Sequence, residues 1–528
     1  MNKKVILLSS VLPLAATAQR YNIVYIMTDD HTAQMMSCYD KSNIETPNLD
    51  RIAAEGVRFT QSYVANSLSG PSRACMLTGK HSHKNGFTNN EHGIFDGSQQ
   101  TMPKLMQQAG YQTAIIGKWH LVSLPTGFDY WNILPAQGDY YNPNFITMNN
   151  DTVREQGYLT NIITDKSIDW LENQRDKSRP FILLIHHKAC HRNWLPEMKY
   201  LREYEDKTFP VPETFYDDYQ GRLAAQQQEM HIDRDMDIVY DTKMFRPDLK
   251  TRLSENYRNM VSRLDSKDLL QYSWFYDSLS LDFYNRFPDM RDGRTTNHSK
   301  AVAEFKYQRY MRDYAKVVKS LDDNVGRVLD YLKQSGLDEN TLVVYTSDQG
   351  FYMGEHGWFD KRFMYQESFA TPLVMQLPKQ LREERAKNLP NDDGIITEMV
   401  QNIDYAPTFV ELAGATVPND IQGTSLLPLL KGQHPKNWRK SLYYHYYEYP
   451  AEHSVKRHYG VYDGRWKLIH FYRDIDQWEL YDLQSDPHEL HNIYGQKGTE
   501  KTLKRLQKEL VRLQKQYDDP IETQLSRK

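Results

Sequence analysis

The chain has 528 residues, of which 39% are hydrophobic, 12% aromatic and 25% charged, and this composition excludes a wholly disordered protein. Its 65 lysines and arginines nearly balance 69 aspartates and glutamates, for a net charge of −4. This balance excludes a broad basic surface for nucleic acid, so an anionic ligand must be bound by a few local cations. At about 150 residues per domain, the length alone predicts three or four domains.

The N-terminus has the features of an export signal. Two lysines precede an apolar run over residues 5–16, and an Ala-Thr-Ala cleavage site ends at Ala18. We therefore predict a signal peptide over residues 1–18 and a periplasmic protein, with secretion as the alternative. A buried first strand is the other interpretation of this run, but residues 21–28 already supply one. No segment approaches the roughly 20 apolar residues of a membrane span, so no span is expected.

Four short apolar segments further along the chain predict buried strands: residues 22–28, 113–117, 181–185 and 342–346. Strands that are apolar on both faces are typical of a mostly parallel sheet covered by helices. One covering helix is predicted over residues 310–332, where apolar residues recur at spacings of three and four, and Gly336 follows its end. The fold class predicted from this alternation is α/β.

The character of the chain changes twice outside this pattern. From about Ser441, tyrosine-rich strand patterns at 466–472 and 478–483 precede a leucine-periodic helix, which predicts a small antiparallel α+β unit. Residues 200–300 are polar, tyrosine-rich and weakly periodic, and we interpret them as an insertion near the functional site.

Each of the four predicted strands ends in residues that a structural turn does not require. In chain order these are Asp29 and Asp30, then Lys118 and His120, then His187, Lys188 and His191, then Asp348 and Gln349. Ligands of open α/β sheets bind at the carboxyl ends of the strands, so these side chains are expected in one crevice. The carboxylate and amide oxygens among them suit Ca²⁺ or Mg²⁺, and zinc would favour histidine and thiolate ligands.

The segment from Ser69 to Lys80, SGPSRACMLTGK, predicts the start of a helix at Pro71. Exposed backbone N–H groups at a helix start favour an anion, and Arg73 can add a charge-assisted pair of hydrogen bonds.

This segment resembles the maturation signature of the type I sulfatases, in its serine form. Four further motifs match that family in order: Asp29-Asp30, GKWH at 117–120, KACH at 188–191, and SDQG at 347–350 followed by Lys361. The resemblance covers most of residues 21–372 and the C-terminal unit, with residues 200–300 the exception. It implies an alkaline-phosphatase-like α/β sandwich, with a mostly parallel central sheet in one catalytic domain over 19–435. A small C-terminal α+β subdomain with an antiparallel sheet would follow over 436–528.

The resemblance also implies the chemistry. A radical-type sulfatase-maturating enzyme would oxidise Ser69 to formylglycine, whose hydrate carries two hydroxyls on one carbon, one to attack sulfur and one to expel sulfate. Modified Ser69 would be nucleophile and metal ligand, and the calcium site would be completed by Asp29, Asp30, Asp348 and Gln349. Other roles are to neutralise sulfate (Arg73, Lys118, Lys361), to protonate the leaving oxygen (His191) and to orient or deprotonate the hydroxyl on modified Ser69 (His120).

This sequence departs from the family pattern at two positions. Gln349 stands where asparagine or histidine is more frequent, which leaves its role as a direct ligand open, and Cys190 stands where proline is common. His187 is the alternative to His191 for the acid.

The substrate prediction depends on a narrower resemblance. Asp360-Lys361-Arg362 after residues 354–359, together with residues 443–460, resembles bacterial exo-acting N-acetylglucosamine-6-O-sulfatases. This implies that Asp360 and Arg362 bind sugar hydroxyls, with His453, or else His458, as a third contact. The substrate implied is the 6-O-sulfate of N-acetylglucosamine in host glycosaminoglycan or mucin glycans.

Three other functions stay open at this point. The first is a sulfatase for another position, on galactose, N-acetylgalactosamine or a uronic acid. The second is a phosphatase or phosphodiesterase of the same superfamily. The third is a glycan-binding protein without activity, which would require that Ser69 stays unmodified.

Overall fold

The structure is a computed structural model that describes residues 20–292 and 299–521. The predicted signal peptide, residues 1–18, lies outside the described residues. In the part of the chain that is described, no helix is both long and apolar enough to cross a membrane.

A ten-stranded sheet forms the centre of the described chain, in the order β11-β2-β10-β9-β1-β8-β4-β5-β6-β7. Its five middle strands run parallel to one another: β9 (Thr341–Ser347), β1 (Asn22–Thr28), β8 (Phe181–His186), β4 (Gln112–Lys118) and β5 (Tyr130–Leu134). The flanking strands include antiparallel pairs: β2 (Gly56–Phe59), β10 (Leu373–Gln376), β11 (Ile395–Ile396), β6 (Asn144–Thr147) and β7 (Thr152–Arg154). The four predicted strands are confirmed, each within one residue at either end, and so is the mostly parallel α/β class.

Helices cover both faces of this sheet because alternate strand residues point to opposite sides. Val24 and Ile26 of β1 pack in one core with α1 (Pro47–Ala54), α5 (Leu159–Asp169) and α9 (Lys300–Gln334). The intervening β1 residues pack in a second core with α2 (Ser69–Thr78), α4 (Met102–Gln108) and α12 (Tyr405–Leu412). The helix predicted over 310–332 lies within α9, and Gly336 beyond its end has a φ of 70°, a left-handed conformation that glycine adopts without strain.

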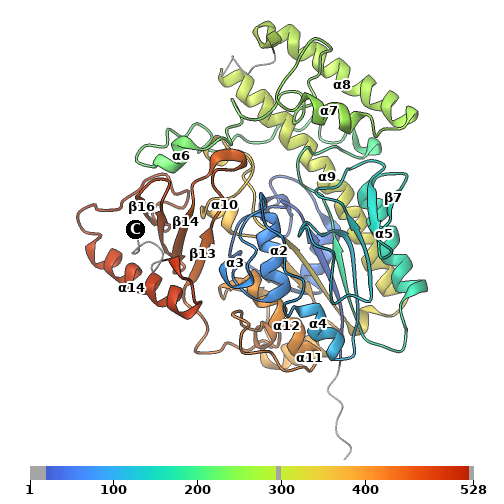
Figure 1. The fold of residues 1–528 in the computed structure, drawn as a ribbon, viewed down its shortest axis with the longest axis vertical. Coiled ribbons are helices and arrows are strands. Elements are labelled where there is room, and N and C mark those ends of the chain that lie inside the picture. Colours follow the sequence, from blue (N-terminus) through green and yellow to red (C-terminus); the bar gives the residue numbers. More distant parts are fainter. Residues whose placement is uncertain (1–19, 293–298, 522–528) are drawn as a thin grey trace, which may run out of the picture.

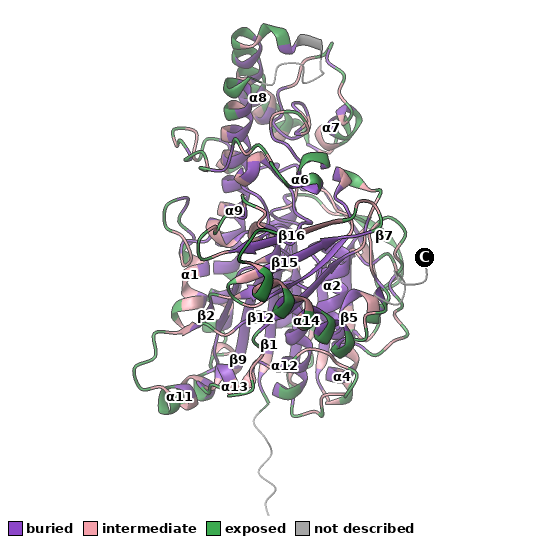
Figure 2. Cartoon of the chain, turned by 90° about the vertical axis from the view of Figure 1, so that its left-hand side faces the viewer, coloured by how far each residue is buried: buried purple, intermediate pink, exposed green. Residues whose placement is uncertain are grey.

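A separate antiparallel sheet follows in the C-terminal part of the chain. It contains β13 (Leu442–Tyr446), β14 (His458–Tyr462), β15 (Trp466–Phe471) and β16 (Gln477–Asp482). One face packs against leucines of α14 (Glu500–Gln516), whose outer face is exposed in Figure 2. The other face packs against aromatic residues of 358–369, next to the predicted site. The predicted antiparallel α+β unit is therefore confirmed.

The stretch from 200 to 300 contains, within its described residues, the α-helices α6 (Leu223–Gln227), α7 (Ser254–Val261) and α8 (Ser266–Arg286). In Figure 1 α7 and α8 lie at the top of the molecule, beside the first turns of α9. A buried ion pair of 3.1 Å between Lys243 Nζ and Asp313 Oδ2 joins this stretch to α9.

Other short helices connect these elements: α3 (Ser82–Asn85), α10 (Gln366–Phe369), α11 (Lys379–Asn388) and α13 (Leu427–Leu430). Strands β3 (Ser62–Tyr63) and β12 (Val400–Gln401) form a two-stranded parallel sheet.

Candidate active site

The carboxyl ends of the parallel strands bring the predicted polar residues together. In the register of the sheet, Met27 of β1 is opposite His186 of β8, and Thr28 is opposite Ser347 of β9. Gly117 of β4 is also opposite His186. The residues that follow these positions therefore meet at one edge, as predicted.

Ser69 is the first residue of α2 and is almost fully buried at this edge. Its Oγ donates a hydrogen bond to Asp29 Oδ1 at 3.0 Å. Residue 68, the N-cap, is leucine and provides no side-chain acceptor, so no side-chain cap satisfies the first backbone N–H groups of the helix. A helix start of this kind favours an anion.

Each of the three buried carboxylates is paired with its own cation. Lys118 Nζ donates to Asp29. Lys361 Nζ donates to both oxygens of Asp30, at 2.7 and 2.8 Å. Arg73 donates through Nε and Nη2 to Asp348 Oδ2, at 3.0 and 2.9 Å. Each cation offsets part of the cost of burying its carboxylate, so the three pairs allow an acidic cluster inside the protein.

The acidic cluster has the chemistry of a site for a hard cation. Three potential ligand atoms lie within 4.8 Å of one another: a carboxylate oxygen of Asp29, a carboxylate oxygen of Asp30 and a ring nitrogen of His191. Gln349 donates through Nε2 to Asp30 Oδ1 at 2.5 Å, while its buried Oε1 has no hydrogen-bond partner among the described residues. An unpartnered amide oxygen beside carboxylates fits a metal ligand, and oxygen ligands suit Ca²⁺ and Mg²⁺.

The pKa values show the cost of holding these carboxylates together. Burial opposes ionisation of Asp29, but the surrounding cations, Lys118 first among them, hold its pKa well below the usual value. Burial and the neighbouring carboxylates raise the pKa of Asp30 to about 7, against the effect of Lys361. Burial and Asp29 raise the pKa of Asp348 to about 6. A divalent cation at this point would remove that repulsion.

Two histidines of the strand-end loops face the cluster. His191 Nε2 lies 3.9 Å from Asp30 Oδ2, and its Nδ1 is 2.8 Å from the backbone oxygen of residue 192. His120 has a buried Nδ1 without a partner among the described residues, and burial holds its pKa well below the usual value. His187 is buried and forms no hydrogen bond or ion pair with the acidic cluster among the described residues, so the geometry favours His191 over His187 as the acid.

The residues predicted to bind sugar lie beside Lys361. Asp360 Oδ1 is 3.2 Å from Arg362 Nε, and Asp360 Oδ2 is 3.4 Å from His453 Nε2. His458 instead accepts from the backbone N–H of Met364 and lies 2.8 Å from the backbone oxygen of residue 456, so both ring nitrogens are used inside the protein. The geometry therefore favours His453 over His458.

Several of these residues have a left-handed backbone, which is rare outside glycine: Asp30, His120, Asp360, Arg362 and His453, with φ between 58° and 95°. Such conformations are unfavourable by about 1–3 kcal/mol each and concentrate at functional sites.

Comparison with known proteins identifies the family. The family model described as "Sulfatase" matches residues 21–415, and a second model, "N-sulphoglucosamine sulphohydrolase, C-terminal", matches residues 354–516. The chain belongs to the sulfatase family. Members of this family use a formylglycine residue and a divalent metal, which agrees with Ser69 and the acidic cluster at the start of α2. The prediction of a sulfuric ester hydrolase is confirmed.

Individual relatives of this sulfatase agree with the family assignment. It is 49% identical over 524 residues to an N-acetylglucosamine-6-O-sulfatase of Bacteroides thetaiotaomicron, covering 97% of this chain and 89% of the relative. It is 48% identical to a solved structure in complex with its substrate, D-glucosamine-2-N,6-O-disulfate, with a TM-score of 0.87 and coverage of 95% and 99%. A phosphonate monoester hydrolase of Agrobacterium radiobacter is 18% identical with a TM-score of 0.66, over 94% and 96% of the two chains, and shares the fold. These structures confirm the alkaline-phosphatase-like sandwich.

The sulfatase site also contains residues that the motifs did not indicate. Gln137 accepts from Lys118 Nζ at 2.5 Å, and its Nε2 lies 3.2 Å from His120 Nε2. Tyr140 donates to the backbone oxygen of His191 at 2.7 Å. Both lie in the loop after β5, which matches none of the motifs, so only the fold reveals them.

Proposed function

We propose that this sulfatase is exo-acting and removes the 6-O-sulfate of a terminal N-acetylglucosamine. The observation that carries the proposal is the segment Asp360-Lys361-Arg362. Lys361 reaches the carboxylate of Asp30 in the acidic cluster, while the neighbouring Asp360 contacts both Arg362 and His453. One short segment thus joins the sulfate site to the sugar contacts, which fixes the distance between sulfate and ring hydroxyls.

The sugar contacts have free hydrogen-bonding capacity. Arg362 is 6% exposed; it forms ion pairs with Asp360 through Nε and with Glu448 through Nη1, but neither nitrogen makes a hydrogen bond to a described residue. Asp360 offers carboxylate oxygens at 3% exposure. A carboxylate that accepts from one hydroxyl and an arginine that donates to its neighbour together recognise two adjacent hydroxyls of a sugar. His453 is held by a 2.6 Å contact between its Nδ1 and the backbone oxygen of Glu229, so Nε2 faces Asp360.

The reacting sulfate would lie between the start of α2 and the lysines. Lys118, Lys361 and the free N–H groups of the helix oppose its negative charge. Burial lowers the pKa of His191 well below its usual value, and an anionic ester beside Nε2 would raise it again, so the proton is held when substrate is present. His191 would then donate this proton to the departing sugar oxygen. His120, with its unpartnered Nδ1, would accept from or orient the hydroxyl at residue 69.

We further propose Ca²⁺ as the divalent metal, held by Asp29, Asp30, Asp348, Gln349 and the oxygen of modified residue 69. The donor set is all oxygen, and a bound cation would polarise the sulfate and the attacking hydroxyl. A sulfatase-maturating enzyme that oxidises Ser69, and export to the periplasm through residues 1–18, belong to the same proposal and are supported by the sequence alone. A mucin glycan stands beside glycosaminoglycan as the source of the sugar.

A panel of sulfated monosaccharides tests the proposal. The protein is produced with a maturating enzyme, and mass spectrometry of the Ser69 peptide verifies a loss of about two hydrogens. Sulfate release is then measured from N-acetylglucosamine-6-sulfate, galactose-6-sulfate, N-acetylgalactosamine-4-sulfate and a 2-sulfated uronic acid. Turnover confined to the first is expected, and Asp360→Ala should abolish it while Ca²⁺ binding and the modification persist. Equal turnover of galactose-6-sulfate, or near wild-type activity of Asp360→Ala, would contradict the proposal.

A further inference from the structure

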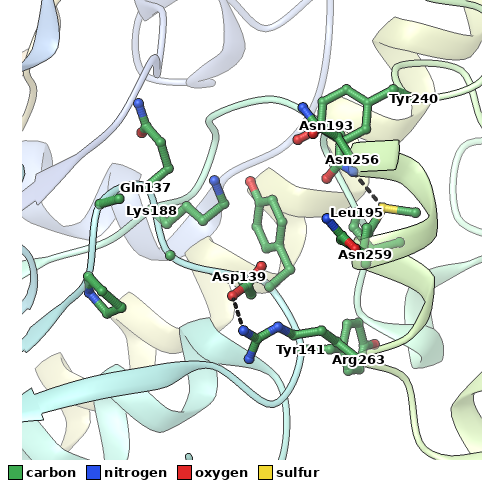
Figure 3. Close-up of a pocket in the computed structure, with 15 residues that line it drawn as sticks. Gln137, Asp139, Tyr141, Lys188, Asn193, Leu195, Tyr240, Asn256, Asn259 and Arg263 are labelled. Carbon is green, nitrogen blue, oxygen red and sulfur yellow. Dashed lines mark hydrogen bonds and ion pairs between the residues drawn. The ribbon is translucent and has the colours of Figure 1, made fainter. Parts of the chain in front are cut away.

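A cavity of about 330 Å³ is lined by Lys188 and Asn193, which lie on either side of the candidate acid His191 in the chain. The loop after β5, residues 135–141, and Lys188 of the loop after β8 contribute to its lining. The rest of the lining includes Asn193, which lies beside Tyr240 in Figure 3, and residues of the stretch between 200 and 300: Tyr240, Asn256, Asn259, Met260 and Arg263. Figure 3 shows Gln137 and Lys188 on one side of this pocket, with Tyr240 and Asn256 on the other.

The pocket shares its wall with the active site. Gln137 contacts both Lys118 and His120, and Tyr140 holds the backbone of His191. A sugar whose sulfated carbon lies next to His191 therefore has other parts of its ring, or the next sugar of the chain, within reach of this pocket.

The charges that line the pocket do not cancel. Arg263 Nη2 is paired with Asp139 Oδ2 at 3.0 Å, and its Nη1 donates to the backbone oxygen of Asn142. Lys188 has no carboxylate within ion-pair distance among the described residues. Its Nζ reaches only the backbone oxygen of Arg192, at 3.4 Å, and lies 5.2 Å from the centre of the Tyr140 ring. Two cations and one carboxylate leave the pocket with one unpaired positive charge.

This unpaired charge is also removed from water. Lys188 is 5% exposed, and burial lowers its pKa to about 8, so the ammonium form still predominates at neutral pH. An ammonium group is strongly hydrated, and its burial without a counter-ion is costly. Lys118 and Lys361, the other buried lysines of the site, each have a carboxylate partner. Lys188 lacks a carboxylate partner in the part of the chain that the structure describes, which indicates that its partner comes with the ligand.

We propose that this pocket binds a second anionic group of the substrate, with Lys188 as the counter-ion and the amides of Asn193, Asn256 and Asn259 around it. The inference rests on the proposed function and extends it: the natural substrate would be an acidic glycosaminoglycan. The anion has two possible sources with the same chemistry, a sulfate on the nitrogen of the same glucosamine or the carboxylate of a neighbouring uronic acid.

Substrates that differ in the second anionic group test the proposal, with enzyme in which Ser69 has been oxidised. The value of kcat/KM is measured for N-acetylglucosamine-6-sulfate, for glucosamine-2-N,6-O-disulfate, and for 6-sulfated N-acetylglucosamine linked either to glucuronic acid or to galactose. In each pair, one substrate carries the second anionic group and the other does not. The wild-type enzyme is expected to have a kcat/KM at least about tenfold higher for the anionic substrate of one pair, which is the contribution of one well-placed ion pair. Preference for the disulfate assigns the pocket to the N-sulfate, and preference for the glucuronate-linked disaccharide assigns it to the carboxylate.

Lys188→Met should remove that preference, whereas Lys188→Arg should retain most of it. Lys199→Met is the matched control, since Lys199 is 53% exposed outside the pocket and paired with Glu197, and it should keep the wild-type ratio. Loss of activity by the same factor on all substrates in Lys188→Met, or no anion preference in wild type, would overturn the inference.

A binding measurement distinguishes failure of the pocket inference from failure of the proposed function. Calorimetry measures the binding of two ligands that cannot be turned over: glucosamine-2-N-sulfate, and the glucuronate-linked disaccharide without its 6-sulfate. If either ligand binds, and if both Lys188→Met and added salt weaken that binding at least tenfold, the result supports the pocket. This conclusion holds even if no 6-sulfated sugar is hydrolysed. If 6-sulfated sugars are hydrolysed but neither anion binds, the proposed function stands and the pocket does not.

Discussion

Arg73 donates two hydrogen bonds to the same oxygen of Asp348, from Nε at 3.0 Å and from Nη2 at 2.9 Å. The other oxygen, Oδ1, is left toward Asp30, whose backbone N–H lies 3.3 Å from it. Arg73 Nη1 donates to the backbone oxygen of Lys118. The arginine of the maturation motif thus fixes the orientation of a carboxylate in the acidic cluster, in addition to the charge role predicted for it.

We therefore expect Arg73→Lys to weaken metal binding as well as catalysis. Lysine keeps the charge but cannot make two planar hydrogen bonds, so Asp348 would lose its fixed orientation. Residues that orient metal ligands contribute about 10–100-fold in affinity. Titration with Ca²⁺ in competition with a chelator measures this, and Arg51→Lys, a surface arginine paired with Asp330, is the control. Unchanged Ca²⁺ affinity in Arg73→Lys would show that Arg73 acts on the sulfate alone.

Metal binding should depend strongly on pH. Without a metal, burial and mutual repulsion raise the pKa of Asp30 to about 7 and of Asp348 to about 6, so both bind protons that a cation must displace. A carboxyl whose pKa is raised by folding destabilises the metal-free fold above its unfolded pKa, increasingly so as pH rises toward the raised value. The gain in thermal midpoint on adding Ca²⁺ is thus expected to be larger at pH 8 than at pH 5.5. An equal gain at both values would argue against these carboxyls as ligands.

The assignment of His191 as acid can be tested with the leaving group. A sugar alkoxide leaves poorly without a proton, whereas a nitrophenolate needs none, so His191→Asn should slow sugar sulfate hydrolysis by about 10²–10⁴-fold and aryl sulfate hydrolysis far less. His187→Asn is the matched variant in the same loop and should affect both substrates alike. Steady-state rates of sulfate release from the two substrates provide the comparison. The reverse pattern between the two variants would assign the acid to His187.

The parts of the fold that could be predicted are those where one residue pattern has one physical outcome. The strand at 342–346 is apolar on both faces, which only a buried strand explains, and Gly336 marks the preceding helix end. β10 and β11 were not predicted because such short strands carry too few residues for a period.

The site residues also divide into those that a sequence pattern predicts and those that only the fold reveals. Asp29, Ser69 and Asp348 lie in motifs, so the resemblance found them. Gln137 matters because of its contacts with Lys118 and His120, and no local pattern encodes a contact between loops. The absence of a carboxylate partner for Lys188 among the described residues likewise depends on contacts in three dimensions, which no local sequence pattern encodes.

The attachment of the C-terminal sheet depends on a buried aspartate, and its removal gives the last prediction. Asp519 Oδ2 lies 2.7 Å from His445 Nδ1, accepts from Tyr443 at 2.7 Å and is 3.3 Å from His83 Nδ1 of α3 in the catalytic part. Although burial opposes its ionisation, His445 and His83 hold the pKa of Asp519 well below the usual value. Burial lowers the pKa of His445, so at pH 7 its neutral imidazole binds Asp519 through a charge-assisted hydrogen bond. Hydrogen bonds to charged groups contribute about 1.5–3 kcal/mol each, so Asp519→Ala should lower the free energy of unfolding by about 3 kcal/mol at pH 7.

The neighbouring residue is a built-in control, because Asp518 is paired with Lys84 at 2.9 Å but its side chain is 66% exposed. Asp518→Ala should leave the stability close to that of the wild type, because exposed ion pairs contribute little. Since folding lowers the pKa of Asp519, its contribution is present above the unfolded value of about 4 and is lost as pH falls toward the folded value. Urea unfolding of the three proteins at pH 7 and pH 3 should therefore show the deficit of Asp519→Ala shrinking at the lower pH. A deficit that stays constant would mean that the side chain stabilises the interface by packing and not by charge.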